Sequence, residues 1–387
     1  MTKQATLALL VTVGLAAPAW AQEIACESPS NVFAFSSNRH NTTGTPPLNS
    51  TDIYLMDVDQ NGMPLSNARQ LPGSDDHIVP AADFIPALSP DGKGRIVFDS
   101  NRARDATWEP VNTSDLFLMN HDGTDQRPLT RGSSATWSPN GKRIAFHASA
   151  SGTGQPIKQD PGAPTDDSVI FTARVGDLLK GGVPTQITQP DPGQVDDDAD
   201  WSPVGKKIAF TRKNRDEPDP TNPISAEIYM INVDGRGLTR LTTNTEEERS
   251  PAWSPDGKLI AYSCRKGSQG GNTLEICVMN VADGTVQKLT DNILADLGPH
   301  WSPDGKKILF QRAPPVMGQG QQIWVMNANG TGQTRVMVPP PLPGFTMHPT
   351  WGEIKAKCDD EDDEDDDDDE DDGDEDDEED DIGRDRS

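Results

Sequence analysis

The sequence predicts an all-β protein, a six-bladed β-propeller closed by a strand from the C-terminal part of the chain. Three observations carry this prediction: a recurring motif close to W-S-P-D-G-K-x-I-A-F, short runs rich in β-branched and aromatic residues, and tight-turn signals between the runs. The motif is anchored by a large apolar residue at Leu88, Trp137, Trp201, Trp253, Trp301 and Trp351. Spacings of 49, 64, 52, 48 and 50 residues are close to the length of a four-stranded blade.

Residues 1–21 have the pattern of a signal peptide. Lys3 gives a positive start, "ATLALLVTVGLAA" is an apolar run, and "AWA" before Gln22 fits a small-residue cleavage site. The run is too short to span a bilayer as a helix, and its alternative interpretation is a buried core helix. We therefore expect an exported protein, periplasmic or secreted, without membrane insertion.

Residues 22–358 divide into blades of four runs. The first run ends at the anchor, and an Asp-Gly or Asn-Gly turn usually leads to the second, as in "RIVFDS" and "KILFQR". The third run resembles "EIYMINV", and the fourth ends near "RLT". At the N-terminus "VFAFSSNR" is a second run without a convincing first run, whereas Trp351 ends a first run with no blade after it. Pairing these two closes the ring and removes exposed sheet edges.

The repeat resembles the WD40-like propeller repeats of the TolB family, most clearly in "WSPDGKKILFQR" and "QIWVMNANGTGQTR". The resemblance covers roughly residues 26–354 and implies a non-catalytic propeller in the bacterial cell envelope. TolB itself carries a smaller α/β domain ahead of its propeller, and that domain contacts the Tol machinery. Here the propeller is expected to follow the signal peptide directly, so that role is not carried over.

The longest connections of the predicted propeller join second to third strands and are expected on one face. Long loops on a rigid scaffold are the usual place for binding, so this face is the predicted working face. Segments entering the innermost strands meet the central channel on the same side, and they carry the candidate side chains Asp83, Asp198, Asp200, Glu248, Asp296, His300 and His348. Such a ring can hold calcium through carboxylate oxygens or attract a basic side chain of a partner. Acidic surface loops without a site are the third interpretation.

Catalytic signatures are missing from the sequence: it has no H-E-x-x-H, no G-x-S-x-G and no P-loop. Two hypotheses remain. The favoured one is a non-catalytic, monomeric scaffold that binds a protein or cell-envelope ligand on the long-loop face, without a firm cofactor. The alternative is a metal-assisted lactonase or lyase that acts on a sugar acid at the central channel.

The formal charge of −28 is concentrated at the C-terminal end. Residues 359–387 carry −21 and Lys3 carries +1, which leaves −8 for residues 22–358. An acidic body and a polyanionic tail do not suit a nucleic-acid backbone. The tail is predicted to be disordered, because it has almost nothing apolar to bury. Solubilisation together with loose calcium binding is the favoured role, and capture of a basic partner is the alternative.

Four cysteines without a C-x-x-C pair favour disulfides in an exported protein over a zinc site. Cys264 ends a second strand, and Cys277 lies in the antiparallel third strand of the same blade, so a local bridge is predicted. Cys26 and Cys358 flank the predicted ring seam, and a second bridge between them is predicted there.

Overall fold

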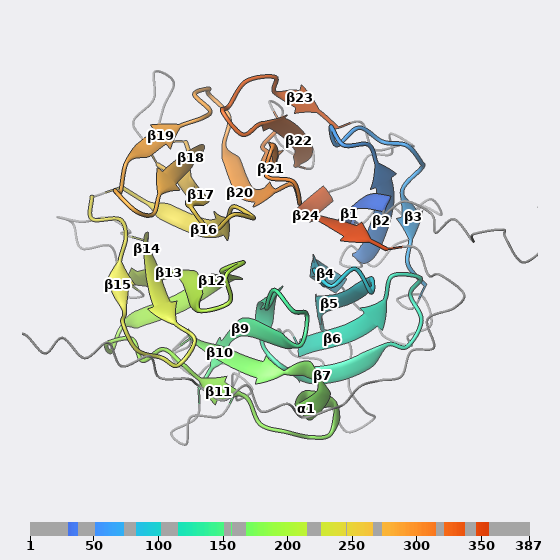
Figure 1. Cartoon of the computed structure of the whole chain (residues 1–387), viewed down its shortest axis with the longest axis vertical. Coiled ribbons are helices and arrows are strands. Elements are labelled where there is room, and N and C mark those ends of the chain that lie inside the picture. Colours follow the sequence, from blue (N-terminus) through green and yellow to red (C-terminus); the bar gives the residue numbers. More distant parts are fainter. Residues whose placement is uncertain are drawn as a thin grey trace, which may run out of the picture. The chain divides into compact units, whose positions relative to one another are not determined.

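The computed structural model describes residues 30–37, 51–72, 83–101, 115–150, 156, 168–214, 226–244, 246–265, 273–314, 321–336 and 346–355. These residues form six antiparallel four-stranded sheets arranged around a central axis (Figure 1). The prediction of an all-β, six-bladed propeller is therefore confirmed. The predicted signal peptide, residues 1–21, and the acidic tail, residues 359–387, lie outside the described residues.

The blades are numbered from the ring seam, and their strands are given from the centre outward. Blade 1 contains β24 (Thr346–Ile354), β1 (Ser30–Ser37), β2 (Asp52–Val58) and β3 (Arg69–Gln70). Blade 2 contains β4 (Asp83–Leu88), β5 (Arg95–Ser100), β6 (Asp115–Asn120) and β7 (Arg127–Arg131). Blade 3 contains β8 (Ser133–Trp137), β9 (Arg143–Ser149), β10 (Ser168–Arg174) and β11 (Thr185–Gln186).

The second half of the ring repeats this order. Blade 4 contains β12 (Gln194–Trp201), β13 (Lys207–Asn214), β14 (Ala226–Asn232) and β15 (Thr239–Arg240). Blade 5 contains β16 (Glu248–Trp253), β17 (Leu259–Cys264), β18 (Glu275–Asn280) and β19 (Val286–Lys288). Blade 6 contains β20 (Asp296–Trp301), β21 (Lys307–Arg312), β22 (Gln322–Asn327) and β23 (Thr334–Arg335).

Ring closure occurs as the unpaired Trp351 motif predicts. Strand β24 supplies the innermost strand of blade 1 and pairs antiparallel with β1 (Figure 1). In this pairing Phe33 lies opposite Trp351. The two rings meet edge to face, with centroids 4.8 Å apart. Because β24 comes from the far end of the described chain, blade 1 joins the two ends of the propeller.

The anchor tryptophans pack between neighbouring blades. Trp301 of blade 6 is 4% exposed and lies in one hydrophobic cluster with Ile276 of blade 5. Its indole Nε1 donates to the carbonyl oxygen of Ala252 in blade 5 at 3.1 Å, and Trp137 donates in the same way to Ala87 at 2.9 Å. The repeated Trp therefore has a structural role, as its recurrence at or near the end of five of the six innermost strands predicts.

One helix appears where the sequence predicts none. Strand β10 runs into α1 (Val175–Leu179), whose Val175 and Leu178 are buried. A single turn of helix does not require the long amphipathic pattern that sequence reasoning looks for, and here it is held by two apolar contacts. In the described part of the chain no helix approaches the length and apolarity needed to cross a membrane.

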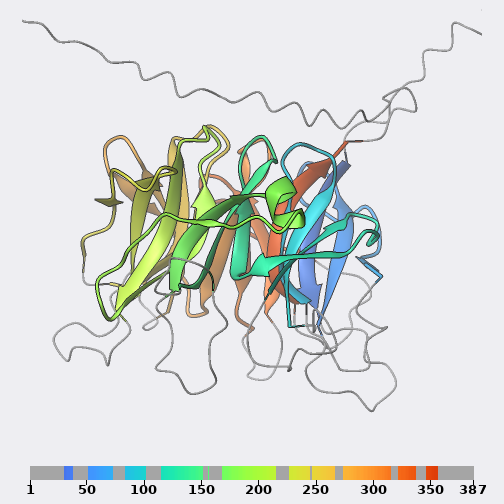
Figure 2. The ribbon, with the colours of Figure 1, turned by 90° about the horizontal axis from the view of Figure 1, so that it is seen from below.

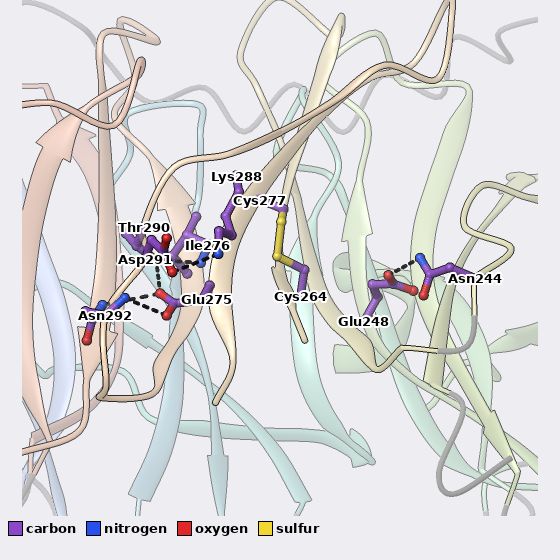
Figure 3. The surroundings of a disulfide bond; sticks show 10 residues. All are labelled: Asn244, Glu248, Cys264, Glu275, Ile276, Cys277, Lys288, Thr290, Asp291 and Asn292. Atoms are coloured by element: carbon purple, nitrogen blue, oxygen red, sulfur yellow. Dashed lines mark hydrogen bonds and ion pairs between the residues drawn. A yellow bond between two sulfur atoms is a disulfide. The ribbon is translucent and has the colours of Figure 1, made fainter. Parts of the chain in front are cut away.

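The local disulfide of blade 5 is present (Figure 3). Cys264 is opposite Glu275 and Cys277 is opposite Tyr262, so the cysteines are diagonal neighbours across β17 and β18, with Cα atoms 5.8 Å apart. This confirms the predicted bridge. The second predicted bridge, between Cys26 and Cys358, lies outside the described residues.

Candidate functional site

A cavity of about 740 Å³ lies on the axis of the ring. Its wall is made by the inner strand of every blade and extends from the level of Ile85 and its equivalents to the Ser-Pro turns that follow the anchors. Because every blade contributes to one wall, this cavity brings together residues that are up to about 270 positions apart in the chain. It is therefore the natural place to look for a site in this fold.

Every inner strand has a bulge at the same level. At each bulge one residue adopts a left-handed conformation, with φ between 47° and 55°, and lines the cavity: Ile85, Ser134, Asp198, Ser250, Gly298 and His348. Five of the six are not glycine, and Ile85 is β-branched, so this backbone geometry is costly and must be enforced by the surrounding structure. We call these six residues the bulge ring.

Side chains of the preceding blade hold the bulges in place. Ser134 donates its backbone N–H to Asp99 Oδ1 at 3.1 Å, and Ser250 donates to Thr211 Oγ1 at 3.1 Å. Gly298 donates to Ser263 Oγ, also at 3.1 Å. Each acceptor lies on a second strand, opposite the bulge of its own blade. The bulge ring is therefore fixed by hydrogen bonds that cross the blade boundaries.

Two candidate carboxylates line the cavity. Asp200 accepts hydrogen bonds from Trp253 N at 2.7 Å and from Thr136 Oγ1 at 3.0 Å, so it links the inner strands of blades 3, 4 and 5. Burial raises its pKa to about 6. Asp198 accepts from Ser250 Oγ at 2.9 Å and is only partly buried. The carboxylate of Asp200 is thus occupied in holding neighbouring blades together, whereas the carboxylate of Asp198 is the more accessible of the two to a ligand in the cavity.

Both candidate histidines line the same cavity. Burial lowers the pKa of His300, whose Nδ1 lies 3.0 Å from the carbonyl oxygen of Trp301. Burial also lowers the pKa of His348, with the charge of Asp198 acting in the opposite direction. Both imidazoles are therefore neutral near pH 7, and a neutral ring has one nitrogen that accepts a hydrogen bond.

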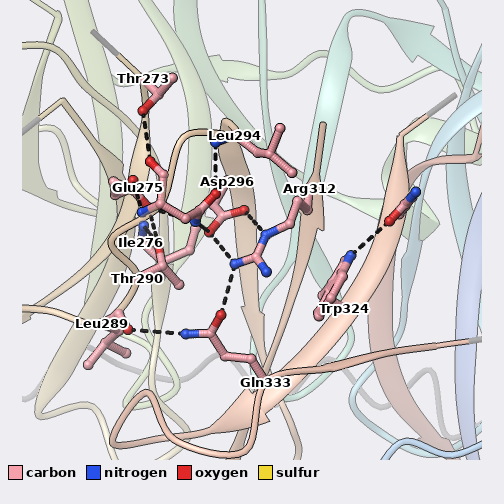
Figure 4. A network of polar contacts seen from close by, with 12 residues as sticks. Thr273, Glu275, Ile276, Leu289, Thr290, Leu294, Asp296, Arg312, Trp324 and Gln333 are labelled. Atoms are coloured by element: carbon pink, nitrogen blue, oxygen red, sulfur yellow. Dashed lines mark hydrogen bonds and ion pairs between the residues drawn. The ribbon is translucent and has the colours of Figure 1, made fainter. Parts of the chain in front are cut away.

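The other three candidates do not line the cavity. Asp83 accepts from Ser100 Oγ at 2.6 Å at the start of β4. Asp296 forms a bidentate ion pair with Arg312, with N–O distances of 2.6 and 2.7 Å (Figure 4).

Glu248 occupies the same strand position in blade 5, but Cys264 stands opposite it, where blade 6 has Arg312. Glu248 accepts from Asn244 Nδ2 at 2.5 Å (Figure 3), and burial raises its pKa to about 7. The single ring of seven residues that the sequence suggested is thus divided between the cavity wall and the blade interiors. Among the described residues no three His, Cys, Asp or Glu side chains are grouped to hold a metal ion.

Two cavity residues were missed by sequence reasoning. Gln311 lies opposite the bulge of blade 6, in register with Asp99, Thr211 and Ser263 of the other blades. It is 5% exposed, yet its Oε1 has no hydrogen-bond partner within the described ranges. The same holds for Thr350 Oγ1 and His348 Nδ1 on β24. Alignment of the second strands would have singled out Gln311 as a polar residue at a position that normally bonds the next blade.

Sequence comparisons find short or distant relatives, and no family model matches the chain. Dipeptidyl-peptidase 5 of Porphyromonas gingivalis is 36% identical over 66 residues, which cover 17% of this chain and 9% of that protein. The uncharacterized peptidase YuxL of Bacillus subtilis is 25% identical over 213 residues, which cover 46% of this chain and 29% of that protein. The chain thus spans less than a third of either curated relative.

Solved structures show the same architecture. TolB from Acinetobacter baumannii superimposes with a TM-score of 0.57 at 19% identity, over 83% of this chain and 66% of TolB. A putative TolB from Agrobacterium tumefaciens gives 0.50 at 18% identity, over 86% of this chain and 100% of that one. Hydrazine synthase of Kuenenia stuttgartiensis gives 0.59 at 16% identity, over 86% and 48%. At these identities the likeness concerns the fold, which is a TolB-like six-bladed propeller.

Proposed function

We propose that this protein is a non-catalytic, exported scaffold that binds a protein or cell-envelope ligand at its central cavity and on its long-loop face. We further propose that the ligand offers an ammonium group to the cavity wall. Three unpartnered polar atoms on the neighbouring strands β21 and β24, those of Gln311, Thr350 and His348, carry this proposal. Two donors on β16, Arg249 Nε and Trp253 Nε1, are unpartnered in another part of the cavity lining.

Buried polar atoms without partners are rare in folded proteins, because each loses its hydrogen bonds to water. Three of them on one cavity wall, on the neighbouring strands β21 and β24, favour a ligand that supplies the missing bonds. A bulge ring held by bonds across the blade boundaries supports the same function, since it gives the wall a fixed shape before the ligand arrives.

The chemistry of the β21 and β24 part of the wall favours a ligand that donates hydrogen bonds. Gln311 Oε1 is an acceptor, and the neutral ring of His348 and the hydroxyl of Thr350 can also accept. Asp198 adds a negative charge close enough to His348 to affect its pKa. A primary ammonium has three donors and a positive charge, so a lysine side chain or a free amino terminus of a partner fits these atoms.

The enzymatic alternative, a metal-assisted lactonase or lyase acting on a sugar acid, needs metal ligands that converge in the channel. His300, His348 and Asp198 line the cavity, but the described residues supply no group of three such ligands. The peptidase names of the two curated relatives concern proteins of which this chain spans less than a third. We therefore rest the non-catalytic function on the unpartnered acceptors of the cavity wall and keep the enzyme as the alternative.

Capture of envelope proteins on the full-length protein, with quantitative mass spectrometry, tests the proposal. The test variant is Gln311→Leu, and Gln287→Leu on the exposed outer strand β19 is the matched control. Loss of a hydrogen bond to a charged group costs about 1.5–3 kcal/mol, so we expect affinity to fall by at least about tenfold in the test variant alone.

Acetylating the amines of the extract before capture should abolish the same interaction. A partner that binds both variants equally would contradict a ligand in the cavity, and a partner that survives acetylation would contradict the ammonium. Polygalacturonate supplied with manganese tests the alternative, because accumulation of an unsaturated sugar product would establish a lyase.

A further inference from the structure

The turns at one end of blades 3 and 4 form a continuous surface. We call it the basic face, and it consists of residues 138–143, 174–184, 202–207 and 232–238. Val175 N donates to Lys142 O at 3.0 Å, and Val233 N donates to Lys206 O at 3.2 Å, so inner and outer turns of each blade are bonded together. In Figure 2, α1 marks this end of the ring, on the same side as the end of β24.

The basic face differs in charge from the rest of the protein. Its four segments contain seven Lys or Arg residues and two Asp residues, a local charge of +5 in a chain whose formal charge is −28. Lys142 and Lys206 occupy the same position of the repeated turn in adjacent blades, and both are exposed. Neither forms an ion pair with a carboxylate of the described residues. The positive charge is therefore available to an external partner.

Two arginines of the basic face are held next to each other. Arg143 and Arg174 are register partners on β9 and β10, and like charges in such a pair repel. Burial and the charge of Arg174 lower the pKa of Arg143, with Asp177 opposing. The nearest bonded group of Arg143 is the hydroxyl of Thr172, 3.3 Å from Nη2, rather than a carboxylate. An arrangement of this kind is stabilised when an anion binds between the guanidinium groups.

Exposed aliphatic side chains lie among these charges. Five large hydrophobic side chains are markedly exposed in the described residues, and three of them belong to the basic face: Val183 at 64%, Val204 at 65% and Leu238 at 47%. Val204 is separated from Lys206 by one residue, at the tip of its turn. A soluble anion does not bury aliphatic side chains when it binds, whereas a lipid bilayer buries them beneath its headgroups.

We propose that the basic face docks onto an anionic lipid bilayer, with its lysines and arginines at the phosphate level and its aliphatic tips among the headgroups. Binding is peripheral and reversible, because turns and not a spanning segment make the contact. An anionic surface contributes about a fivefold gain in partition for each basic residue near it. Charges more than about 10 Å from the lipid are largely screened at 0.1 M salt, so the local +5 determines the sign of the interaction.

Flotation of the full-length protein with vesicles tests this proposal. One vesicle preparation contains equal parts of phosphatidylglycerol and phosphatidylcholine, and the other contains phosphatidylcholine alone. The test variant is the double substitution Lys142→Glu with Lys206→Glu. The matched control is Lys258→Glu with Lys306→Glu, which changes the same turn position in blades 5 and 6 by the same charge. Val204→Ser tests the aliphatic tips separately.

We expect the wild-type protein to bind only the phosphatidylglycerol vesicles. Partition should fall by at least about 25-fold in the test variant and by less than about threefold in the control. Val204→Ser should weaken binding severalfold, because a buried aliphatic side chain is lost.

Equal losses in the two double variants would overturn the proposal, since the charge effect would then not belong to this face. Absence of binding by the wild-type protein, or an unaltered Val204→Ser variant, would also overturn it. Tighter binding to immobilised polyglutamate than to the phosphatidylglycerol vesicles, unchanged in Val204→Ser, would show an acidic polypeptide to be the partner in place of lipid. Near-ultraviolet circular dichroism of every variant confirms that the fold is retained.

Discussion

Replacing Asp99 with Asn should remove much of the pH dependence of folding between about pH 5 and pH 8. Asp99 is 1% exposed, and burial raises its pKa to about 7, against the hydrogen bonds that Ser133 and Ser134 donate to it. The folded state therefore holds the Asp99 proton more tightly than the unfolded chain, where the pKa is about 3.9. The contribution of Asp99 to the unfolding free energy is therefore fully present below about pH 4 and is lost as the pH rises through about 7.

The magnitude follows from the size of the shift. Roughly three pKa units at 1.36 kcal/mol each give about 4 kcal/mol at most, of which about 3 kcal/mol is lost between about pH 5 and pH 8. Asparagine keeps an oxygen to accept the Ser134 N–H and does not titrate. The Asp99→Asn variant should therefore match the wild-type protein near pH 5 and exceed it in unfolding free energy near pH 8.

Urea unfolding followed by tryptophan fluorescence at several pH values measures this effect. Asp200 and Glu248 also have raised pKa values, so the variant keeps part of the wild-type slope. Asp256→Asn is the control, because hydrogen bonds from Ser254 and Lys258 lower the pKa of this exposed residue and its titration ends below the window. Parallel curves for the wild-type protein and Asp99→Asn would refute the reasoning.

Three further predictions concern stability. Cys264→Ser with Cys277→Ser should lower the unfolding free energy by about 3 kcal/mol in oxidising buffer and leave it unchanged in reductant; thiol titration of the denatured, unreduced wild-type protein should find neither sulfur reactive. Trp301→Phe should cost about 1–2 kcal/mol, because a buried carbonyl of blade 5 loses the indole donor; a thermal midpoint equal to the wild-type value would contradict this. Gly141→Ala should lower the unfolding free energy by about 1–2 kcal/mol, since φ at Gly141 is +67° and the added Cβ would lie 2.6 Å from a carboxylate oxygen of Asp91. Gly176→Ala in α1 is the control, because its added Cβ meets nothing within 4 Å and should not destabilise the protein in the same urea titration.

Most of the architecture could be predicted from the sequence because the repeat encodes it locally. A tryptophan ends each innermost strand from blade 3 onward, and the Asp-Gly and Asn-Gly turns fix the hairpins that follow. Ring closure could also be predicted, because Trp351 ends a first strand that no blade follows. Each of these features depends on a few residues that are adjacent in the sequence, so it can be recognised without knowing the tertiary contacts.

The candidate site could be predicted only in part, because the bulges change which side chains face the axis. Alternation along a regular strand would give Asp296 and Gly298 the same face, but a bulge adds a residue and shifts the pattern. The bulge residues share no identity, since Ile85, Asp198 and His348 occupy equivalent positions. The acid at Asp296 is consequently paired with Arg312 inside its blade, while His348 reaches the cavity.

Closure by β24 also determines when the protein can become native. Strand β1 is among the first parts of the propeller to be synthesised, yet its inner neighbour starts at Thr346. Contacts this distant in sequence form slowly, because the intervening chain must be ordered first. Until β24 arrives, the inner edge of β1 stays open to pairing with another chain. Blade 1 is thus completed only after β24 has been synthesised, and a chaperone that shields this edge until then should raise the yield of folded protein.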